Sequence, residues 1–363
     1  MDYPALRRQK LTSTLDQERL DALLISNPVN VTYVTGFSGE SSYLLMTRDR
    51  AILVSDFRFA EQIAEECPGL ETHIRPVDKT MLQASGEILT KLTVRTVGFE
   101  SSHLTVADWE TIRDQAKGCD WKAGRERVEK LRAIKDESEI EQIRGAITIA
   151  DRAFTVFCAL LRPDDREKDL ADALEYYVRK AGGTATSFPS IVAVGPRAAL
   201  PHAPPTERRV DSAELVLVDW GAAGRFYKCD LTRVLATSTI STKLEDVYMV
   251  VLKAQEAALR AIRPGIPVKS VDAEARSVIA DAGFGDFFGH GLGHGLGLQV
   301  HEAPFLRANS DAVLEAGMVA TVEPGIYLPG WGGVRIEDDV LVSADGCEVL
   351  TKQVSRELKS VFV

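Results

Sequence analysis

The first third of the chain alternates short apolar runs with segments of helical periodicity, the pattern of a domain in which strands and helices alternate. Asp21–Ile25 reads as a strand, and Asn27-Pro28 supplies the cap and first-turn proline of a short helix. Tyr43–Met46 and Ala51–Ser55 predict a hairpin, and Ala60–Glu66 predicts a return to helix. This part is therefore expected to form an α/β domain.

A second domain is expected to start near residue 126, which divides the chain into residues 1–126 and 127–363. Asp136 and Glu139 have the spacing of a capping box, so a helix should begin there. The apolar side chains that follow recur at steps of three and four and form one stripe: Ile140, Ile143, Ile147, Ala150, Phe154 and Phe157.

The second part contains an internal repeat. LLRPDDREKDLADALEYYVRKAGG (160–183) and AIRPGIPVKSVDAEARSVIADAGF (261–284) align without a gap at an offset of 101 residues. Such a motif is also a common way to join two helices. The alternative, which we favour, is a duplicated unit of two helices followed by strands, with a site at the seam. The strand-rich segments are expected at Ser190–Val194 with Leu215–Val234, and at Gly297–Val300 with Val319–Val342.

The composition of the chain argues against nucleic-acid-binding, secreted and membrane-spanning proteins. The 363 residues include 43 Lys and Arg against 53 Asp and Glu, and this net charge of −10 argues against a nucleic-acid partner. The N-terminal stretch lacks the apolar core of a signal peptide, and no apolar run approaches the ~20 residues of a membrane span. The five cysteines are scattered without a CxxC pair, as expected of reduced, non-catalytic thiols. We expect a cytoplasmic protein.

Four of the six histidines gather in segments rich in Gly and Pro: His202, His290, His294 and His301. The run GHGLGHGLGLQVHE disfavours a helix and allows the backbone to approach a ligand closely. It is not the helical HExxH zinc motif. Taken alone, this run is equally compatible with a Gly-rich loop that contains incidental histidines.

Two acidic pairs lie in hairpin-like segments. A type II′ turn at Gly224-Arg225 would place Asp219 directly opposite Asp230 on one face of a sheet. Glu323 and Glu337 lie on two apolar strands around the turn PGWGG. Facing carboxylates on a half-buried sheet repel each other and require cations or protons between them.

Two divalent cations would balance these four carboxylates. Carboxylates with one imidazole suit Mn²⁺, Co²⁺, Fe²⁺ or Zn²⁺, and Mn²⁺ is the ion we expect first. A site with two such ions activates water and stabilises a tetrahedral intermediate. The predicted reaction is hydrolysis.

These residues resemble the pita-bread metallopeptidases, a family that includes aminopeptidase P, prolidase and methionine aminopeptidase. The resemblance spans the second part, through PHAPP, DWGAAGRFYKCDLTR, GHGLGHGLGLQVHEAP, TVEPGIY and GVRIEDD. LLISNPVNVTYVTGFSG (23–39) is similar to the N-terminal domain of creatinase, prolidase and aminopeptidase P, which methionine aminopeptidases lack. The resemblance implies an α/β N-terminal domain followed by an α+β pita-bread catalytic domain with an internal pseudo-two-fold repeat.

The resemblance also implies roles for individual residues. The five metal ligands would be Asp219, Asp230, His294, Glu323 and Glu337. Asp230 and Glu337 would bridge the two metals. His202 and His301 would bind substrate and stabilise the gem-diolate, while His290 would line the proline pocket. Arg335 would buttress the site, and Glu323 would also shuttle the proton to the departing nitrogen.

The activity implied is hydrolysis of the Xaa-Pro bond by a metal-bridging hydroxide, in dipeptides or at the N-terminus of longer peptides. Proline-containing peptides would be the substrates, and we expect a homodimer with neither nucleic acid nor membrane as partner. Prolidases tend to carry an Arg four residues after the histidine equivalent to His301, in HExPR, whereas this chain has Phe305. An apolar residue cannot pair with the carboxylate of a dipeptide, which favours a longer peptide. Arg307 can substitute, and the short spacing from Glu323 to Glu337 resembles compact prolidases, so both substrate classes stay open.

Two other classes compete with the peptidase. One is a metal-free binding or regulatory protein on the same fold, and the other is a creatinase-like hydrolase that needs no metal. Both are disfavoured because all five ligand positions are filled.

Overall fold

The computed structural model describes residues 1–362 and divides into two compact units, Met1–Arg132 and a second that begins at Ala133. This division falls slightly after residue 126 because the intervening segment is bonded to the first unit. The Arg127 guanidinium donates to the Glu18 carboxylate (2.6 Å) and to the carbonyl oxygen of Phe99 (3.1 Å).

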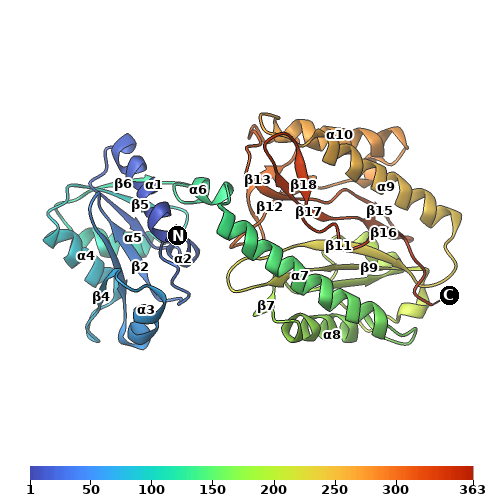
Figure 1. Ribbon diagram of the computed structural model, residues 1–363, viewed down its shortest axis with the longest axis horizontal. Coiled ribbons are helices and arrows are strands. Elements are labelled where there is room, and N and C mark those ends of the chain that lie inside the picture. The colour runs from blue at the N-terminus through green and yellow to red at the C-terminus, as the bar shows by residue number, and fades with distance from the viewer. Residues whose placement is uncertain (363) are drawn as a thin grey trace. The chain divides into compact units, whose positions relative to one another are not determined.

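The first unit is an α/β domain, as the sequence predicts (Figure 1). Its sheet has the order β4-β3-β2-β1-β5-β6, antiparallel where β2 pairs with β1 and β3 and parallel elsewhere. The predicted hairpin and helices are confirmed. The elements are α1 (Tyr3–Glu18), β1 (Ala22–Ile25), α2 (Pro28–Thr35), β2 (Tyr43–Met46), β3 (Ala51–Ser55), α3 (Ala60–Glu66), β4 (Glu71–Ile74), α4 (Met81–Lys91), β5 (Thr96–Glu100), α5 (Val106–Gln115), β6 (Asp120–Gly124) and α6 (Glu129–Ala133).

The second unit packs two helix pairs against short antiparallel sheets. Its elements are α7 (Glu137–Leu160), α8 (Glu167–Lys180), β7 (Ala185–Thr186), β8 (Ile191–Val194), β9 (Leu215–Trp220), β10 (Ala222–Ala223), β11 (Leu231–Ala236), α9 (Thr242–Ala261), α10 (Val268–Asp281), β12 (Gly293–Gly295), β13 (Glu302–Leu306), β14 (Val319–Val322), β15 (Gly325–Leu328), β16 (Gly332–Arg335), β17 (Asp338–Val342) and β18 (Cys347–Val349). The main sheets have the orders β11-β9-β8 and β13-β12-β14-β17-β18.

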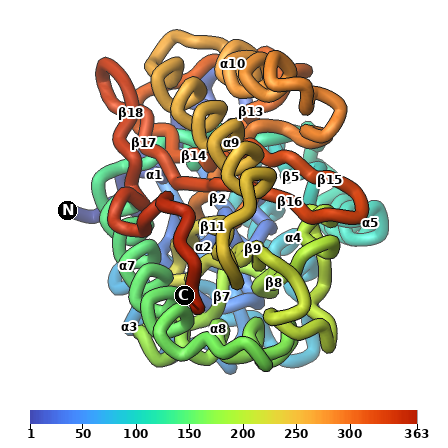
Figure 2. The backbone as a smooth tube through the Cα atoms, turned by 90° about the vertical axis from the view of Figure 1, so that its right-hand side faces the viewer, coloured from blue at the N-terminus to red at the C-terminus, as the bar shows by residue number. Residues whose placement is uncertain are grey.

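The repeat seen in the sequence is a repeat in the structure. Helices α8 and α10 begin and end at positions 101 residues apart, and so do the last residues of α7 and α9. The predicted capping box of α7 is present, since Asp136 accepts from the backbone of Glu139 while the Glu139 side chain accepts in return. Figures 1 and 2 show α9 and α10 lying together on one part of the second unit, with α7 and α8 together on another. The helix pairs therefore flank the strands that carry the candidate site.

The prediction of a strand at Gly297–Val300 is wrong. This segment forms bends, and the strands are β12 before it and β13 after it. The Gly-rich run gives β12 its place in the sheet, because a Cβ on Gly293 would lie 2.1 Å from the carbonyl oxygen of Thr321 and a Cβ on Gly295 would lie 2.2 Å from that of Ala303. These glycines admit close neighbouring backbone on both sides.

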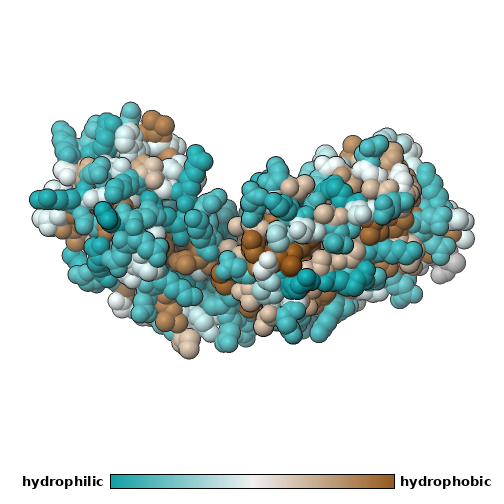
Figure 3. Space-filling view, turned by 90° about the horizontal axis from the view of Figure 1, so that it is seen from above, coloured by the Kyte–Doolittle hydropathy of each residue, from teal (hydrophilic) through white to brown (hydrophobic). Residues whose placement is uncertain are grey.

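The surface agrees with the composition of the chain. The face seen in Figure 3 is mostly hydrophilic, with hydrophobic side chains in small groups. All five cysteines are free, as expected from their scattered positions. Within residues 1–362, no helix has both the length and the apolar character needed to cross a membrane.

The close approach at Gly293 makes a prediction that can be measured by urea unfolding. Gly293→Ala forces β12 away from β14, and overpacking of this kind costs about 1–3 kcal/mol of unfolding free energy. Gly289→Ala is the matched control in the same Gly-rich run, because among the described residues no heavy atom outside residues 288–290 lies within 4 Å of the added carbon. It should change the unfolding free energy by less than about 0.5 kcal/mol. Equal effects would refute the packing role of Gly293.

Candidate metal centre

Five predicted ligands come from five places in the second unit. Asp219 lies in β9, Asp230 directly precedes β11, and His294 is the middle residue of β12. Glu323 lies between β14 and β15, and Glu337 lies between β16 and β17. The strands of both repeats thus contribute side chains to one place.

The first acidic pair is not arranged as the sequence predicted. Thr232, and not Asp230, is the cross-strand partner of Asp219. The register is shifted by two residues, and because side chains alternate along a strand, an even shift keeps both aspartates on the same face. Asp219 and Asp230 are therefore diagonal neighbours and not directly opposed residues.

The turn explains the shifted register. The backbone N–H of Gly224 donates to the carbonyl oxygen of Tyr227 at 2.9 Å, which centres the turn on Arg225 and Phe226. The predicted turn at Gly224-Arg225 is wrong, since the preference of glycine for a turn position is outweighed by the strand register, which pairs Gly224 with Tyr227.

The second acidic pair lies where the sequence predicts. β14 pairs with β17 and β15 pairs with β16 in one continuous register, with Val322 opposite Asp338 and Gly325 opposite Arg335. Glu323 and Glu337 occupy matching positions in the gap between these two ladders. An isolated bridge from Glu337 to Thr232 of β11 then joins this hairpin to the first one.

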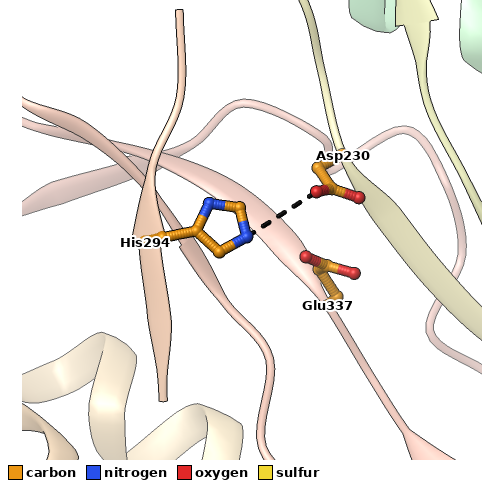
Figure 4. Close-up of side chains that lie close together, drawn as sticks. All are labelled: Asp230, His294 and Glu337. Carbon is orange, nitrogen blue, oxygen red and sulfur yellow. Dashed lines mark ion pairs between the residues drawn. The ribbon is translucent and has the colours of Figure 1, made fainter. Parts of the chain in front are cut away.

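The side chains converge around His294 (Figure 4). Its Nε2 lies 3.3 Å from Glu323 Oε1 and 3.8 Å from Asp230 Oδ2. Ligand atoms of Asp230, His294 and Glu337 all lie within 4.8 Å of one another. Such spacing suits oxygen and nitrogen donors around a cation.

Two threonines that the sequence reading missed orient these carboxylates. The hydroxyl of Thr232 donates to Glu337 Oε2 at 2.6 Å, and that of Thr321 donates to Glu323 Oε1 at 3.0 Å. Each threonine lies two residues from an acidic candidate along the chain, in DLT and in TVE. The two-residue period of a strand could have identified both, since it places each threonine on the same face as its acid.

Arg335 is buried and supplies the cationic side chain of the cluster. Its Nη2 donates to Asp219 Oδ2 at 2.5 Å, its Nε to Thr232 Oγ1 at 3.0 Å and its Nη1 to the hydroxyl of Tyr327 at 2.9 Å. The other oxygen of Asp219, Oδ1, is buried and has no hydrogen-bond partner among residues 1–362. A buried carboxylate oxygen in that situation needs a further ligand.

The electrostatics of the four acids follow from burial and repulsion. Burial raises the pKa of Asp230 well above its usual range, and the charges of Glu337 and Asp219 raise it further. Burial, then Glu323 and Asp219, likewise raise the pKa of Glu337 well above its usual range. The pKa values of Asp219 and Glu323 are also raised by burial, although Arg335 opposes the shift in both.

These residues fit divalent cations. Four carboxylates with one arginine leave an excess of buried negative charge, and an unpaired buried charge is costly. Burial lowers the pKa of His294, which keeps its imidazole in the neutral form that binds metals. Oxygen donors with one imidazole nitrogen suit Mn²⁺, Co²⁺, Fe²⁺ and Zn²⁺.

A cavity of about 590 Å³ contains the whole candidate site. Its lining includes every residue that the sequence singled out: His202, Asp219, Asp230, His290, His294, His301, Phe305, Arg307, Glu323, Arg335 and Glu337. Apolar and proline side chains complete the wall, among them Phe188, Pro201 and Pro204. The cavity is large enough to hold a small peptide.

The other histidines lie beside the acidic cluster. The ring of His301 stands edge-on to that of His294, with centroids 4.2 Å apart. His290 Nε2 lies 2.8 Å from the hydroxyl of Tyr327, a residue not predicted from the sequence. Burial lowers the pKa of both His290 and His301, so both imidazoles are neutral near pH 7. The Nδ1–H of His290 donates to the carbonyl oxygen of Gly291 at 2.7 Å, so its Nε2 accepts the hydroxyl of Tyr327, whereas His301 can donate a ring N–H to a substrate.

Comparison with known proteins assigns the family. Residues 141–344 match metallopeptidase family M24, and residues 7–134 match the creatinase/prolidase N-terminal domain. The protein is therefore a metallopeptidase: the chain belongs to family M24 and carries a creatinase/prolidase N-terminal domain.

Individual relatives match along almost the full chain. An Xaa-Pro dipeptidase of Pyrococcus horikoshii is 35% identical over 99% of this chain and 100% of its own. The structure of an Xaa-Pro dipeptidase from Bacillus anthracis superimposes with a TM-score of 0.94 at 37% identity, covering 98% of this chain and 99% of that one. An X-Pro aminopeptidase from Thermotoga maritima has a TM-score of 0.91 at 34% identity, with coverage of 98% and 99%. The expected α/β domain followed by a pita-bread catalytic domain is confirmed.

Repulsion among the four acids predicts that Asp230→Asn has opposite effects on the stability of the protein without metal and with Mn²⁺. Without metal, Asp230→Asn should stabilise the protein increasingly as the pH rises, because burial and the charges of Glu337 and Asp219 raise the pKa of Asp230 and its ionisation therefore costs the folded state stability. With Mn²⁺ present, the same variant loses a ligand and should be less stable than the unmodified protein. Each effect should be on the order of 1–3 kcal/mol.

Thermal unfolding with a chelator and with Mn²⁺ measures both effects. Asp286→Asn is the control, since Asp286 is exposed and lies outside the cavity lining. If Asp230→Asn shifts the midpoint in the same direction under both conditions, the cluster is not a cation site.

Proposed function

We propose that the protein hydrolyses the peptide bond that precedes proline in short peptides. The observation that carries this proposal is the convergence of four acids and His294 in one cavity with three further histidines. The names of relatives support the choice of bond, since the P. horikoshii protein is an Xaa-Pro dipeptidase and the T. maritima protein an X-Pro aminopeptidase.

The ligand set proposed for two divalent cations, Mn²⁺ first among them, is Asp219, Asp230, His294, Glu323 and Glu337. Asp230 and Glu337 would serve both cations, as the resemblance to the pita-bread metallopeptidases implies, and both are buried with ligand atoms within 4.8 Å of each other and of His294. When bound, such cations lower the pKa of water and polarise a carbonyl group.

The remaining residues bind the peptide and move protons. His202 and His301 donate ring N–H groups to the scissile carbonyl oxygen, where negative charge develops during attack. Glu323, hydrogen-bonded to Thr321, carries the proton to the departing proline nitrogen. His290, hydrogen-bonded to Tyr327, faces the proline ring, and Arg335 pairs with Asp219 and orients its carboxylate.

The substrate's carboxyl end is assigned to the part of the cavity formed by β13. Phe305 is 40% exposed and the guanidinium of Arg307 lies 5.3 Å from the centre of its ring, and both side chains line the cavity. A cation is thus available two residues beyond the position that HExPR would fill. We assign Arg307 to the free carboxylate of a dipeptide, so that dipeptides and longer peptides are both substrates.

Products formed from Ala-Pro, Ala-Pro-Ala and Ala-Ala-Ala test the substrate assignment. The Mn²⁺-loaded protein should cleave the first two and leave Ala-Ala-Ala intact. Arg307→Ala should lower kcat/KM for Ala-Pro by roughly 5- to 100-fold, because an unpaired carboxylate costs about 1–3 kcal/mol. Ala-Pro-Ala places a neutral amide where Ala-Pro has its carboxylate, so kcat/KM for Ala-Pro-Ala should fall less in Arg307→Ala. Two results together would favour a strict aminopeptidase. Arg307→Ala would leave the preference between Ala-Pro and Ala-Pro-Ala unchanged, and Phe305→Arg would gain activity on Ala-Pro alone.

The division of roles among histidines makes a separate prediction. His202→Ala and His301→Ala should retain bound Mn²⁺ while kcat falls by about 10²–10³, the usual cost of losing an oxyanion donor. His294→Ala should instead lose Mn²⁺. Elemental analysis beside steady-state kinetics measures both properties, and three variants with the same loss of metal would contradict the assignment.

A further inference from the structure

Helices α8 and α10, the symmetry-related helices of the repeat, each carry a buried acid. Glu167 at the start of α8 is 0% exposed, and Asp272 in α10 is 1% exposed. Neither residue lines the cavity. Each acid pairs with an arginine and with the backbone of a segment that does line it, which gives the two helices a direct connection to the candidate site.

On α10, the pair is Asp272 and Arg276, one helical turn apart. Two nitrogens of Arg276 donate to the Asp272 carboxylate, each at 2.9 Å. The same guanidinium donates to the carbonyl oxygens of Phe288 and His290, both at 2.8 Å. Asp272 Oδ1 accepts the backbone N–H of Leu292 at 3.1 Å. Every second residue from 288 to 292 is thus held by one ion pair, with His290 at the centre.

On α8, Glu167 holds both ends of the loop that carries His202. Its Oε1 accepts the backbone N–H of Val194 at 2.8 Å, and its Oε2 accepts the backbone N–H of Thr206, also at 2.8 Å. Arg197 donates to Oε2 at 2.9 Å and reaches the carbonyl oxygen of Pro204 at 2.5 Å. The loop from 194 to 206 is therefore closed by a single carboxylate.

We propose that these two ion pairs are positioning elements for catalysis: Asp272–Arg276 sets the place of His290, and Glu167–Arg197 sets that of His202. A buried charge must be fully hydrogen-bonded to be tolerated, and both pairs use backbone groups of a histidine-bearing segment for that purpose. Loss of one partner leaves the other charge unpaired and frees the segment. In each half of the repeat, an ion pair with a buried acid thus hydrogen-bonds the backbone of a segment that carries a histidine.

A double-mutant cycle tests the α10 pair, and it rests on the proposed function for its activity readout. Arg276→Ala should lower kcat/KM for Ala-Pro-Ala by about 10- to 100-fold, since a misplacement near 1 Å of a group that positions the substrate has an effect of this size. In a His290→Ala background the same change should have almost no further effect, because Arg276 acts through His290. Arg260→Ala is the matched control: it removes a 70% exposed arginine that also pairs four residues away, with Glu256 of α9.

A second readout needs no activity. The chain has six histidines, so their ring proton signals can be assigned from single His→Ala variants by NMR. Arg276→Ala should shift the signal of His290 while the signals of His73 and His103, in the first unit, stay in place. If the unmodified protein does not cleave Xaa-Pro peptides, the proposed function fails while this spectrum still tests the pair.

The α8 pair is tested in the same way with Glu167→Gln, which keeps the size of the side chain. It should shift the His202 signal, leave that of His290 in place and lower kcat in the manner of His202→Ala. Additive losses in the double mutants, or unchanged histidine signals in folded Arg276→Ala and Glu167→Gln proteins, would overturn the proposal.

Discussion

The structure of the second unit depends on how it accommodates four acids in one buried cluster. Asp219, Asp230 and Glu337 are buried, and Glu323 faces the same cavity. Their repulsion opposes folding unless positive charge or protons intervene. Arg335 neutralises part of this charge through Asp219, and the remaining excess is what makes the cluster suitable for divalent cations.

The strands hold the four repelling acids in fixed positions relative to one another. Both hairpins place their acids at the ends of ladders or in a gap between them. The hydroxyl of Thr232 orients the carboxylate of Glu337, and that of Thr321 orients the carboxylate of Glu323. Gly293 and Gly295 then let β12 carry His294 between two neighbouring strands. Helices α8 and α10 lie outside the cavity lining, yet their buried acids hold the loops of His202 and His290. Side chains of the two helix pairs thus hydrogen-bond the loops of both histidines, just as the strands carry the acids.

The sequence predicts those features of the fold that depend on residues close together in the chain, such as helix ends and the register of a hairpin. The constant register around PGWGG placed Glu323 opposite Glu337 correctly, and the helix boundaries of the repeat follow from its 101-residue offset. The turn near Gly224 differs from the prediction because the pairing of β9 with β11 sets its position, and turn preferences of single residues do not reveal that register. The roles of Tyr327 and Arg276 are not predictable from local pattern, because both contact His290, which is distant from each of them in the sequence and is brought near by tertiary packing.

Anomalous X-ray diffraction from crystals of the active, Mn²⁺-loaded protein tests the central claim most directly, because it locates the cations that the acids are proposed to bind. The account predicts two anomalous peaks in the cavity, among Asp219, Asp230, His294, Glu323 and Glu337. Crystals of fully active enzyme with no peak in that cavity would contradict it.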